Sequence, residues 1–260
     1  YLTGKEDGPV RVGLRPGNYE VLATRGFEYS VERKEVRLDE PGDEASVKLN
    51  LKRVLDTPGM VAGDFHVHSA ASMDSSLSHR ERICSFAAEG VELLIATDHD
   101  VLTDYAPAIS ELGLENELLS LVGVEATSML MQKNTPFTIG HYNAWPLKFD
   151  PMQPKNGMIP DEGIRPRMLY ERLKTIGEDN MLIQVNHGRG WEPDGGASYF
   201  HALGTEFDEP LAFNSSKPMN EFPNNLLLQR TAGGTRDIDF DAMEILNGAA
   251  YDEYLLLRND

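Results

Sequence analysis

Apolar and polar residues alternate along the first stretch of the chain, up to about residue 57. This period of two is typical of strands with one buried face and one solvent-exposed face. The turn sequence Arg-Pro-Gly-Asn at residues 15–18 separates two of the runs, because proline fixes φ and glycine tolerates a positive φ. We predict a small β-sandwich-like domain over residues 1–57, whole or in part, with strands at 10–14, 19–23 and 47–51.

From residue 61 the pattern changes to apolar strands separated by amphipathic helices. Ser78 and Glu81 have the spacing of a capping box at the start of the first helix, and Gly90 marks its end. The segment 188–236 is rich in Gly, Pro, Asn and Ser, which is typical of a functional loop. We predict an α/β fold with a mostly parallel sheet over residues 58–260. The predicted strands are 61–67, 91–96, 118–124, 137–145, 181–186 and 240–246, and the later helices are 104–114, 167–176 and 249–257.

The acidic composition of the chain limits the kinds of molecule that it can bind. The 260 residues carry a formal net charge of −18, with 42 acidic and 24 basic residues. This field repels nucleic acids and anionic membranes, but bound divalent ions can reverse it locally for a small anionic substrate. The single cysteine, Cys84, forms no internal disulfide, and no apolar run of about 18 residues predicts a membrane span. We expect a small-molecule substrate, no nucleic acid and no membrane insertion, and the oligomeric state stays open.

Metal-competent side chains follow the predicted strands at their ends. His66 and His68 lie on one side of the first strand, because side chains alternate with period two. The second strand ends in Thr-Asp-His-Asp at residues 97–100, and Glu125 ends the third. His141 lies within the fourth strand and His187 follows the fifth. Because the carboxyl ends of strands in a parallel α/β barrel converge on one mouth, these residues predict a shared metal site.

The types of ligand indicate the class of metal. Imidazoles and carboxylates without thiolates suit Zn, Mn or Fe better than Mg or Ca. The candidate ligands exceed what one tetrahedral ion uses, so we predict two or three divalent ions. A carboxylate such as Glu125 can bridge a pair of ions, and ions a few Å apart activate a shared hydroxide for attack on a phosphoryl or carbonyl centre.

Taken in order, these motifs resemble the polymerase and histidinol phosphatase (PHP) superfamily of metal-dependent hydrolases. The matching residues are Asp64-x-His66-x-His68, Asp74, Thr97-Asp98-His99, Gly123-x-Glu125, His141 and His187. The resemblance covers the chain from about residue 61 to its end and implies a distorted seven-stranded (β/α)7 barrel with up to three metal ions. The sequences at 140–146 and 186–187 look most like the CehA/McbA-type branch, which includes carbamate-cleaving enzymes. Residues 14–21 resemble carboxypeptidase-regulatory-like β-sandwiches, which favours a periplasmic or secreted location by analogy.

The resemblance also implies roles for the ligands. His66 and His68 would bind the first metal, Glu125 would bridge the first and second, and His141 and His187 would complete the second. Asp74 and His99 would hold a third. The superfamily pattern closes with a late Asp-x-His, and nothing after His187 supplies it. Either the chain is cut before that strand or the site is incomplete, and we favour a trimmed chain.

Two residues near the ligands are candidates for catalysis. Arg189 follows His187 and either grips an anionic substrate or a developing oxyanion, or lies on the surface. Asp98 precedes His99 and either caps a helix or supports the ligands.

Two functions remain open at this point. The first is a metal-dependent hydrolase that uses a metal-activated hydroxide on a phosphoester or on an amide or carbamate ester. The alternative is a non-catalytic metal-binding or structural module with a degenerate PHP barrel. A nucleic-acid exonuclease is disfavoured by the acidic charge and by the lack of a basic stripe.

Overall fold

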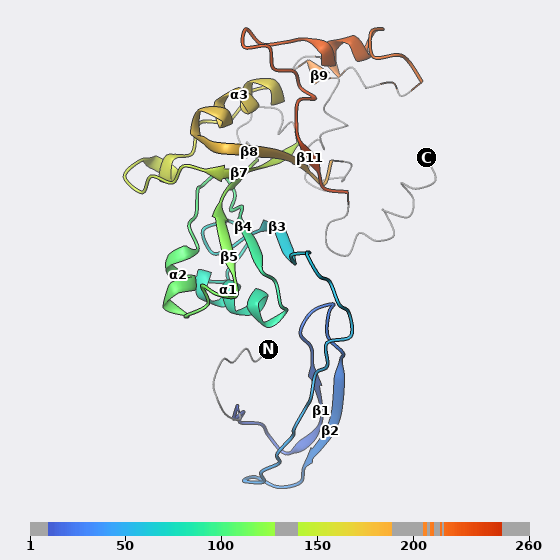
Figure 1. The fold of residues 1–260 in the computed structure, drawn as a ribbon, viewed down its shortest axis with the longest axis vertical. Helices are drawn as coiled ribbons and strands as arrows, with labels where there is room; N and C mark the ends of the chain where they lie inside the picture. The colour runs from blue at the N-terminus through green and yellow to red at the C-terminus, as the bar shows by residue number, and fades with distance from the viewer. Residues whose placement is uncertain are drawn as a thin grey trace. The chain divides into compact units, whose positions relative to one another are not determined.

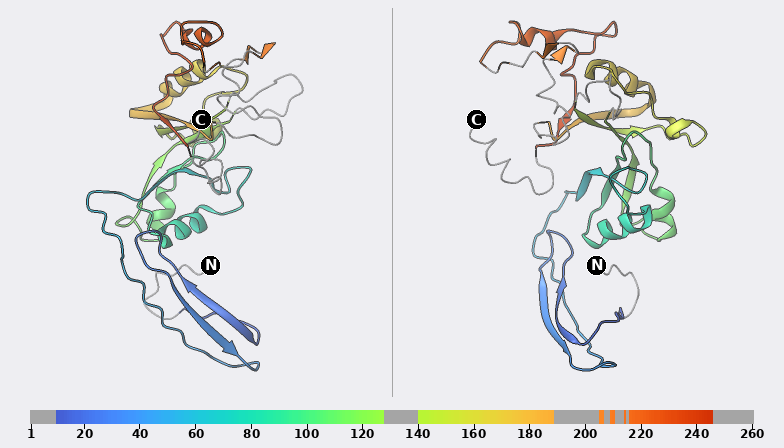
Figure 2. Two further views of the ribbon diagram at one scale, coloured as in Figure 1. Left: turned by 90° about the vertical axis from the view of Figure 1, so that its right-hand side faces the viewer. Right: turned by 180° about the vertical axis from the view of Figure 1, so that it is seen from behind.

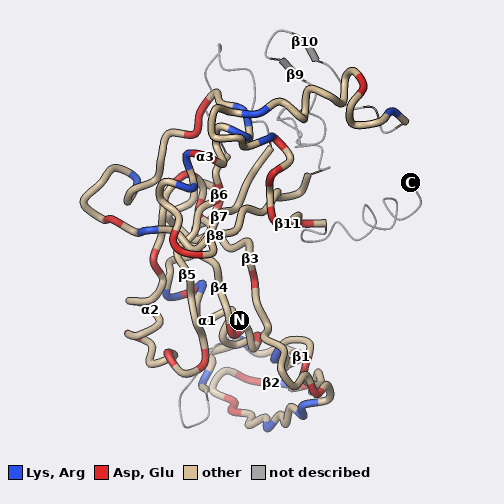
Figure 3. The backbone as a smooth tube through the Cα atoms, turned by 45° about the horizontal axis from the view of Figure 1, so that its top comes forward, with Lys and Arg blue, Asp and Glu red and all other residues tan. Residues whose placement is uncertain are grey.

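The computed structural model describes residues 10–127, 140–188, 205–206, 209–210, 214 and 216–245 (Figure 1). The chain divides into two compact units. Unit 1 comprises Tyr1–Asp64, Leu77–Leu94 and Ala106–Leu119, and unit 2 comprises Phe65–Ser76, Ile95–Tyr105 and Ser120–Asp260. All seven candidate metal ligands therefore belong to unit 2. Acidic residues recur along the chain in both units, in keeping with the net charge of −18 (Figure 3).

Unit 1 contains a β-hairpin near the start of the described chain (Figures 1 and 2). Strands β1 (Gly17–Ala23) and β2 (Glu32–Leu38) are antiparallel, with Gly17 opposite Leu38 and Ala23 opposite Glu32. The predicted strands at 10–14 and 47–51 are wrong, since neither segment belongs to a strand. Alternating hydrophobicity indicates that a segment has one apolar face and one polar face. It does not show that a neighbouring strand is available to form hydrogen bonds with that segment. The β-sandwich and the boundary after residue 57 stay predictions.

The helices of unit 1 are α1 (His79–Ala88) and α2 (Ala106–Glu111). The predicted capping box is present, because the Ser78 side chain accepts from the backbone of Glu81 and the Glu81 side chain accepts from the backbone of Ser78. Gly90, just beyond the last turn, has φ of 73°, which favours glycine. The sequence therefore placed the start and end of α1 correctly.

Three strands form a sheet in the order β3-β4-β5: β3 (Gly63–Val67), β4 (Leu93–Ala96) and β5 (Leu119–Val122). The carboxyl-terminal part of each strand belongs to unit 2, where the candidate ligands follow. The predicted strands at 61–67 and 91–96 are confirmed as β3 and β4. The predicted strand at 118–124 is divided, because β6 begins just after Gly123.

Unit 2 contains a second sheet with the order β11-β8-β7-β6. Its strands are β6 (Val124–Ala126), β7 (His141–Leu147), β8 (Gly177–Asn186) and β11 (Ala242–Met243). Strand β7 is antiparallel to both β6 and β8, and only β11 with β8 is parallel. The prediction of a mostly parallel sheet is therefore wrong for these pairs. Apolar runs show that a strand is buried, but they do not encode its direction.

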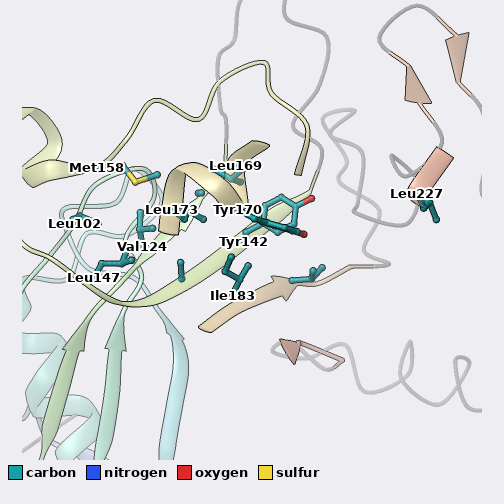
Figure 4. Close-up of a cluster of buried hydrophobic side chains, with 13 residues drawn as sticks. Leu102, Val124, Tyr142, Leu147, Met158, Leu169, Tyr170, Leu173, Ile183 and Leu227 are labelled. Carbon is teal, nitrogen blue, oxygen red and sulfur yellow. The ribbon is translucent and has the colours of Figure 1, made fainter. Parts of the chain in front are cut away.

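The core of unit 2 lies between this sheet and helix α3 (Pro166–Ile176) (Figure 4). Leu169, Tyr170 and Leu173 of α3 are buried, because positions three and four apart share one face of a helix. The rings of Tyr142 and Tyr170 pack edge to face with centroids 5.4 Å apart. The shorter elements of this unit are β9 (Thr205–Glu206), β10 (Glu209–Pro210) and the 3-10 helices η1 (Pro154–Gly157) and η2 (Asn224–Leu228).

The mixed α/β class is confirmed. Over the described residues the strands form four small sheets and do not close into a barrel. The predicted helix at 249–257 lies outside the described residues. No described helix has the length and apolar character needed to cross a bilayer.

Candidate metal centre

The centre of the site is the carboxylate of Glu125, which is fully buried. Its Oε2 atom lies 3.0 Å from His66 Nε2, 2.8 Å from His68 Nε2 and 3.4 Å from His99 Nδ1. Its Oε1 atom lies 3.1 Å from His141 Nδ1 and 3.5 Å from His187 Nε2. The two carboxylate oxygens therefore face two different groups of imidazoles.

The five imidazoles surround this carboxylate as a closed ring. Neighbouring centroids are 5.0 Å apart for His66 and His68, 4.4 Å for His68 and His99, and 5.8 Å for His99 and His141. The ring closes with 4.8 Å from His141 to His187 and 5.9 Å from His187 to His66. The structure thus brings together the five histidines that the sequence singled out.

The end of β3 is held in place by β4 and the residues that follow it. The hydroxyl of Thr97 accepts from Val67 N at 2.7 Å and donates to Val67 O at 3.1 Å. Asp98 is fully buried, and its carboxylate accepts from the backbone and the hydroxyl of Ser69 at 2.6 and 2.9 Å. These contacts fix the backbone on both sides of His68.

Glu125 is fixed through its own backbone. Its N–H donates to Asp98 O at 3.2 Å, and its carbonyl accepts from Asp100 N at 2.9 Å. On the other side, Glu125 lies opposite Asn143 in the antiparallel pair of β6 and β7. An added Cβ at Gly123 would lie 2.9 Å from a backbone oxygen, so the approach of the strands here requires glycine.

The antiparallel direction of β7 explains how His141 reaches the cluster. His141 is the first residue of β7, and it lies opposite Asn186 at the end of β8. In an antiparallel sheet the start of one strand meets the ends of its neighbours. His141 therefore joins Glu125 and His187 although it does not follow a strand.

A chain of buried amides orients the Glu125 carboxylate. Asn143 Nδ2 donates to the carbonyl of Phe65 at 2.7 Å, so the Asn143 Oδ1 atom must accept. Asn186 Nδ2 donates to that oxygen at 2.8 Å and to Glu125 Oε1 at 2.9 Å, and Asn186 Oδ1 accepts from Gln184 at 3.0 Å. Because a backbone carbonyl can only accept, the direction of every bond in this chain is determined.

The cluster contains two triads with the spacing of metal ligands. They are His66, Glu125 and His187, and His68, Asp74 and His99, with ligand atoms within 4.8 Å of one another in each. Two ligands that are each about 2.1 Å from one ion are about 3.0–3.4 Å apart at angles of about 90–109°. The separations of 2.8–3.5 Å around Glu125 lie close to this range.

Two imidazole nitrogens support the fit of a metal. Among the described residues, His68 Nε2 and His99 Nδ1 are buried and make no well-aligned hydrogen bond, although Glu125 Oε2 lies 2.8 and 3.4 Å away. Coordination of an ion would give both nitrogens a well-aligned partner. The donor set of imidazoles and carboxylates also suits Zn, Mn or Fe.

The electrostatics of the cluster without metal show strong coupling. Burial disfavours the charged form of Glu125, but the imidazoles of His141, His187, His66 and His68 hold the pKa of this carboxyl well below its usual value. Burial also opposes the protonation of His66, yet Glu125 and Glu244 raise its pKa to about 10. The same balance raises the pKa of His68, whereas burial lowers the pKa of His99. In the metal-free protein, protons on His66 and His68 therefore compete with a metal ion for the same imidazole nitrogens.

The structure groups the predicted ligands differently from the resemblance. His66 shares a triad with His187 rather than with His68, and His68 shares one with Asp74 and His99. Asp74 accepts from His68 Nδ1 at 2.8 Å and from Ser72 at 2.7 Å. Which ion each residue binds stays a prediction.

The two candidate catalytic residues have different outcomes. Asp98 contacts Ser69 and, at 3.4 Å, the hydroxyl of Tyr105, which supports a positioning role, and direct participation in catalysis stays a prediction. Arg189 lies outside the described residues, so its role also stays a prediction.

Sequence reasoning missed Glu244 and Asn186. Glu244 Oε1 lies 3.0 Å from His66 Nδ1, and its Oε2 accepts from His187 N at 2.9 Å. A signal for Glu244 was present, since it is a charged residue inside the apolar run at 240–246. Asn186 is likewise a polar residue at the buried end of β8.

No family model and no curated protein matches the chain. The chain is similar to a crystal structure from Bacteroides vulgatus, described as a two-domain protein containing a predicted PHP-like metal-dependent phosphoesterase. The two share 20% sequence identity with a TM-score of 0.36, over 58% of this chain and 45% of that one. The chain thus spans less than half of the length of that protein. Because this similarity is low, the evidence for a metal centre is the geometry of the histidines around Glu125.

Proposed function

We propose that the protein is a metal-dependent hydrolase of the PHP type, with the distorted barrel of that superfamily, and that it acts on phosphoesters. The observation that carries the proposal is the convergence of five imidazoles on one buried carboxylate. A bound pair of divalent ions lowers the pKa of a coordinated water and neutralises charge on a phosphoryl or carbonyl oxygen.

The residues of the chain have distinct parts in this proposal. His66, Glu125 and His187 would hold one ion, and His68, Asp74 and His99 would hold the other. Asn186 fixes the Glu125 carboxylate through its bond of 2.9 Å. Ser72 orients Asp74 in the same way, through a bond of 2.7 Å. Such supporting contacts keep ligands in place before substrate arrives.

The charge of the loaded site supports an anionic substrate. Three described carboxylates contact the histidines of the cluster: Glu125, Asp74 and Glu244. Two divalent ions would bring four positive charges against these three negative ones. The loaded site would then attract a phosphoester although the whole chain is acidic. A metal-activated hydroxide can also attack the carbonyl of an amide or carbamate ester, so the assay includes a carbamate substrate.

The proposal is tested with protein loaded with Mn²⁺ or Zn²⁺. The substrates are a phosphate monoester, a phosphodiester and an aryl carbamate, each with a chromogenic leaving group. We expect phosphoester hydrolysis that Glu125→Gln lowers at least a hundredfold. His79→Gln is the matched control, since His79 lies in α1 of unit 1.

Three outcomes would count against the proposal. Hydrolysis of the carbamate alone would replace the substrate class. Metal uptake without hydrolysis of any substrate would favour the non-catalytic module. Protein that binds less than one equivalent of metal would overturn the metal centre itself.

A further inference from the structure

The carboxylate of Glu244 contacts two members of the first triad. Its Oε1 atom lies 3.0 Å from His66 Nδ1, the nitrogen on the far side of the ring from Glu125. Its Oε2 atom accepts from the backbone N–H of His187 at 2.9 Å. The side chain is 13% exposed, so these contacts are largely shielded from water.

The register of the sheet places Glu244 there. In the parallel pair of β11 and β8, Ala242 lies beside Gln184 and Met243 beside Val185. Glu244 N donates to Val185 O at 2.8 Å, which extends the pairing one residue beyond β11. The ends of two parallel strands meet at one edge of a sheet. Glu244 therefore arrives next to the turn at His187.

We infer that Glu244 is a positioning residue for one of the two metal sites, that of His66, Glu125 and His187. This inference rests on the proposed function, because it requires that this triad binds an ion. Glu244 accepts a hydrogen bond from the Nδ1–H of His66, which leaves the lone pair of Nε2 free to face Glu125 and an ion.

The second contact of Glu244 holds the backbone of the other histidine. His187 has φ of 27°, in a region that residues other than glycine rarely adopt. The bond from its N–H to Glu244 stabilises this turn and so directs the His187 side chain back toward Glu125. Within the described part of the chain, the contacts of Glu244 do not include His68, Asp74 or His99. The effect of Glu244 should therefore be confined to one site.

The test measures Zn²⁺ affinity at each of the two sites by competition with a chromophoric chelator. The variants are Glu244→Gln, which keeps an oxygen acceptor but removes the charge, and Glu244→Ala, which removes both. We expect one site to weaken, by about tenfold in Glu244→Gln and about a hundredfold in Glu244→Ala, while the other stays within twofold. An NMR spectrum of the zinc-loaded protein should show the Nδ1–H tautomer of His66 in wild type.

The matched control is Asp241→Asn. Asp241 precedes β11, its carboxylate accepts from Ile183 N at 2.9 Å, and it belongs to neither triad. If Glu244 acts through His66 and His187, Asp241→Asn leaves both affinities within twofold. If Glu244→Ala and Asp241→Asn each weakened both metal sites to the same extent, β11 would act only through packing. That result would overturn the inference. If Glu244→Ala fails to fold, Glu244→Gln carries the test.

The remaining outcomes separate this inference from the proposed function. Wild-type affinity at both sites in Glu244→Ala would overturn the role of Glu244 and leave the hydrolase proposal intact. Absence of bound metal in the wild-type protein would overturn the proposed function itself.

Discussion

Raising the pH should strengthen metal binding steeply. Burial alone would lower the pKa of His66, but Glu125 and Glu244 raise it to about 10 in the metal-free protein. Nε2 must be free of its proton before it can bind an ion. At pH 7, about one imidazole in 1,000 is then deprotonated, which costs about 4 kcal/mol of apparent binding free energy. We therefore expect the affinity for Zn²⁺ to rise about tenfold per pH unit between about pH 6.5 and 8.5.

The stability of the metal-free protein should change with pH in the opposite direction to its metal affinity. The folded-state pKa of His66 lies above its ordinary value of 6.5. Its protonation therefore stabilises the metal-free fold fully below about pH 6.5, and this contribution is lost as the pH rises through about 10. The rise in Tm on adding Zn²⁺ should accordingly be larger at pH 8.5 than at pH 6.5.

Two measurements check this prediction. Chelator competition at pH 6.5, 7.5 and 8.5 gives the affinity, and calorimetry in buffers of different ionisation enthalpy gives the number of protons released. We expect about one or more protons per chain at pH 8, and a shallower dependence on pH in His66→Gln. An affinity that is the same within threefold at pH 6.5 and 8.5, without proton release, would refute the reasoning.

Three substitutions test other parts of the account. Glu125→Gln should reduce bound metal to less than one equivalent by elemental analysis, because it removes the charge shared by all five histidines, and two retained equivalents would contradict this role. Gly123→Ala should lower the free energy of unfolding in urea by about 1–3 kcal/mol, since its Cβ would lie 2.9 Å from a backbone oxygen. Unchanged stability would show that the strands can separate there. Asp237→Asn should cost about 3–5 kcal/mol, because the fully buried carboxylate holds two arginines at 2.8 and 3.0 Å, and a loss below about 1 kcal/mol would argue against that pairing.

The sequence predicted which side chains form the cluster, because short apolar runs mark where strands end. His66 lies in β3 and His68 directly follows it, His99 comes shortly after β4, and Glu125 directly follows the apolar run at 118–124. In an α/β arrangement such ends gather at one edge, whatever the details of the loops. The spacing of two within His66-x-His68 added that both rings share one side of β3.

The direction of the strands and the pairing of ligands could not be predicted in this way. His141 lies at the start of β7 and reaches the cluster only because that strand runs antiparallel to its neighbours. Direction depends on how the chain crosses between strands, which local hydrophobicity does not record. Glu244 was missed for a related reason, since its role depends on the register of β11 against β8.

We propose that the histidines around Glu125 bind two divalent ions. Crystals of the full chain grown with Zn²⁺, with diffraction data collected on both sides of the zinc absorption edge, test it directly. We expect two anomalous peaks, one within the triad of His66, Glu125 and His187 and one within the triad of His68, Asp74 and His99. Absence of a peak among these imidazoles, or peaks only at the protein surface, would contradict it.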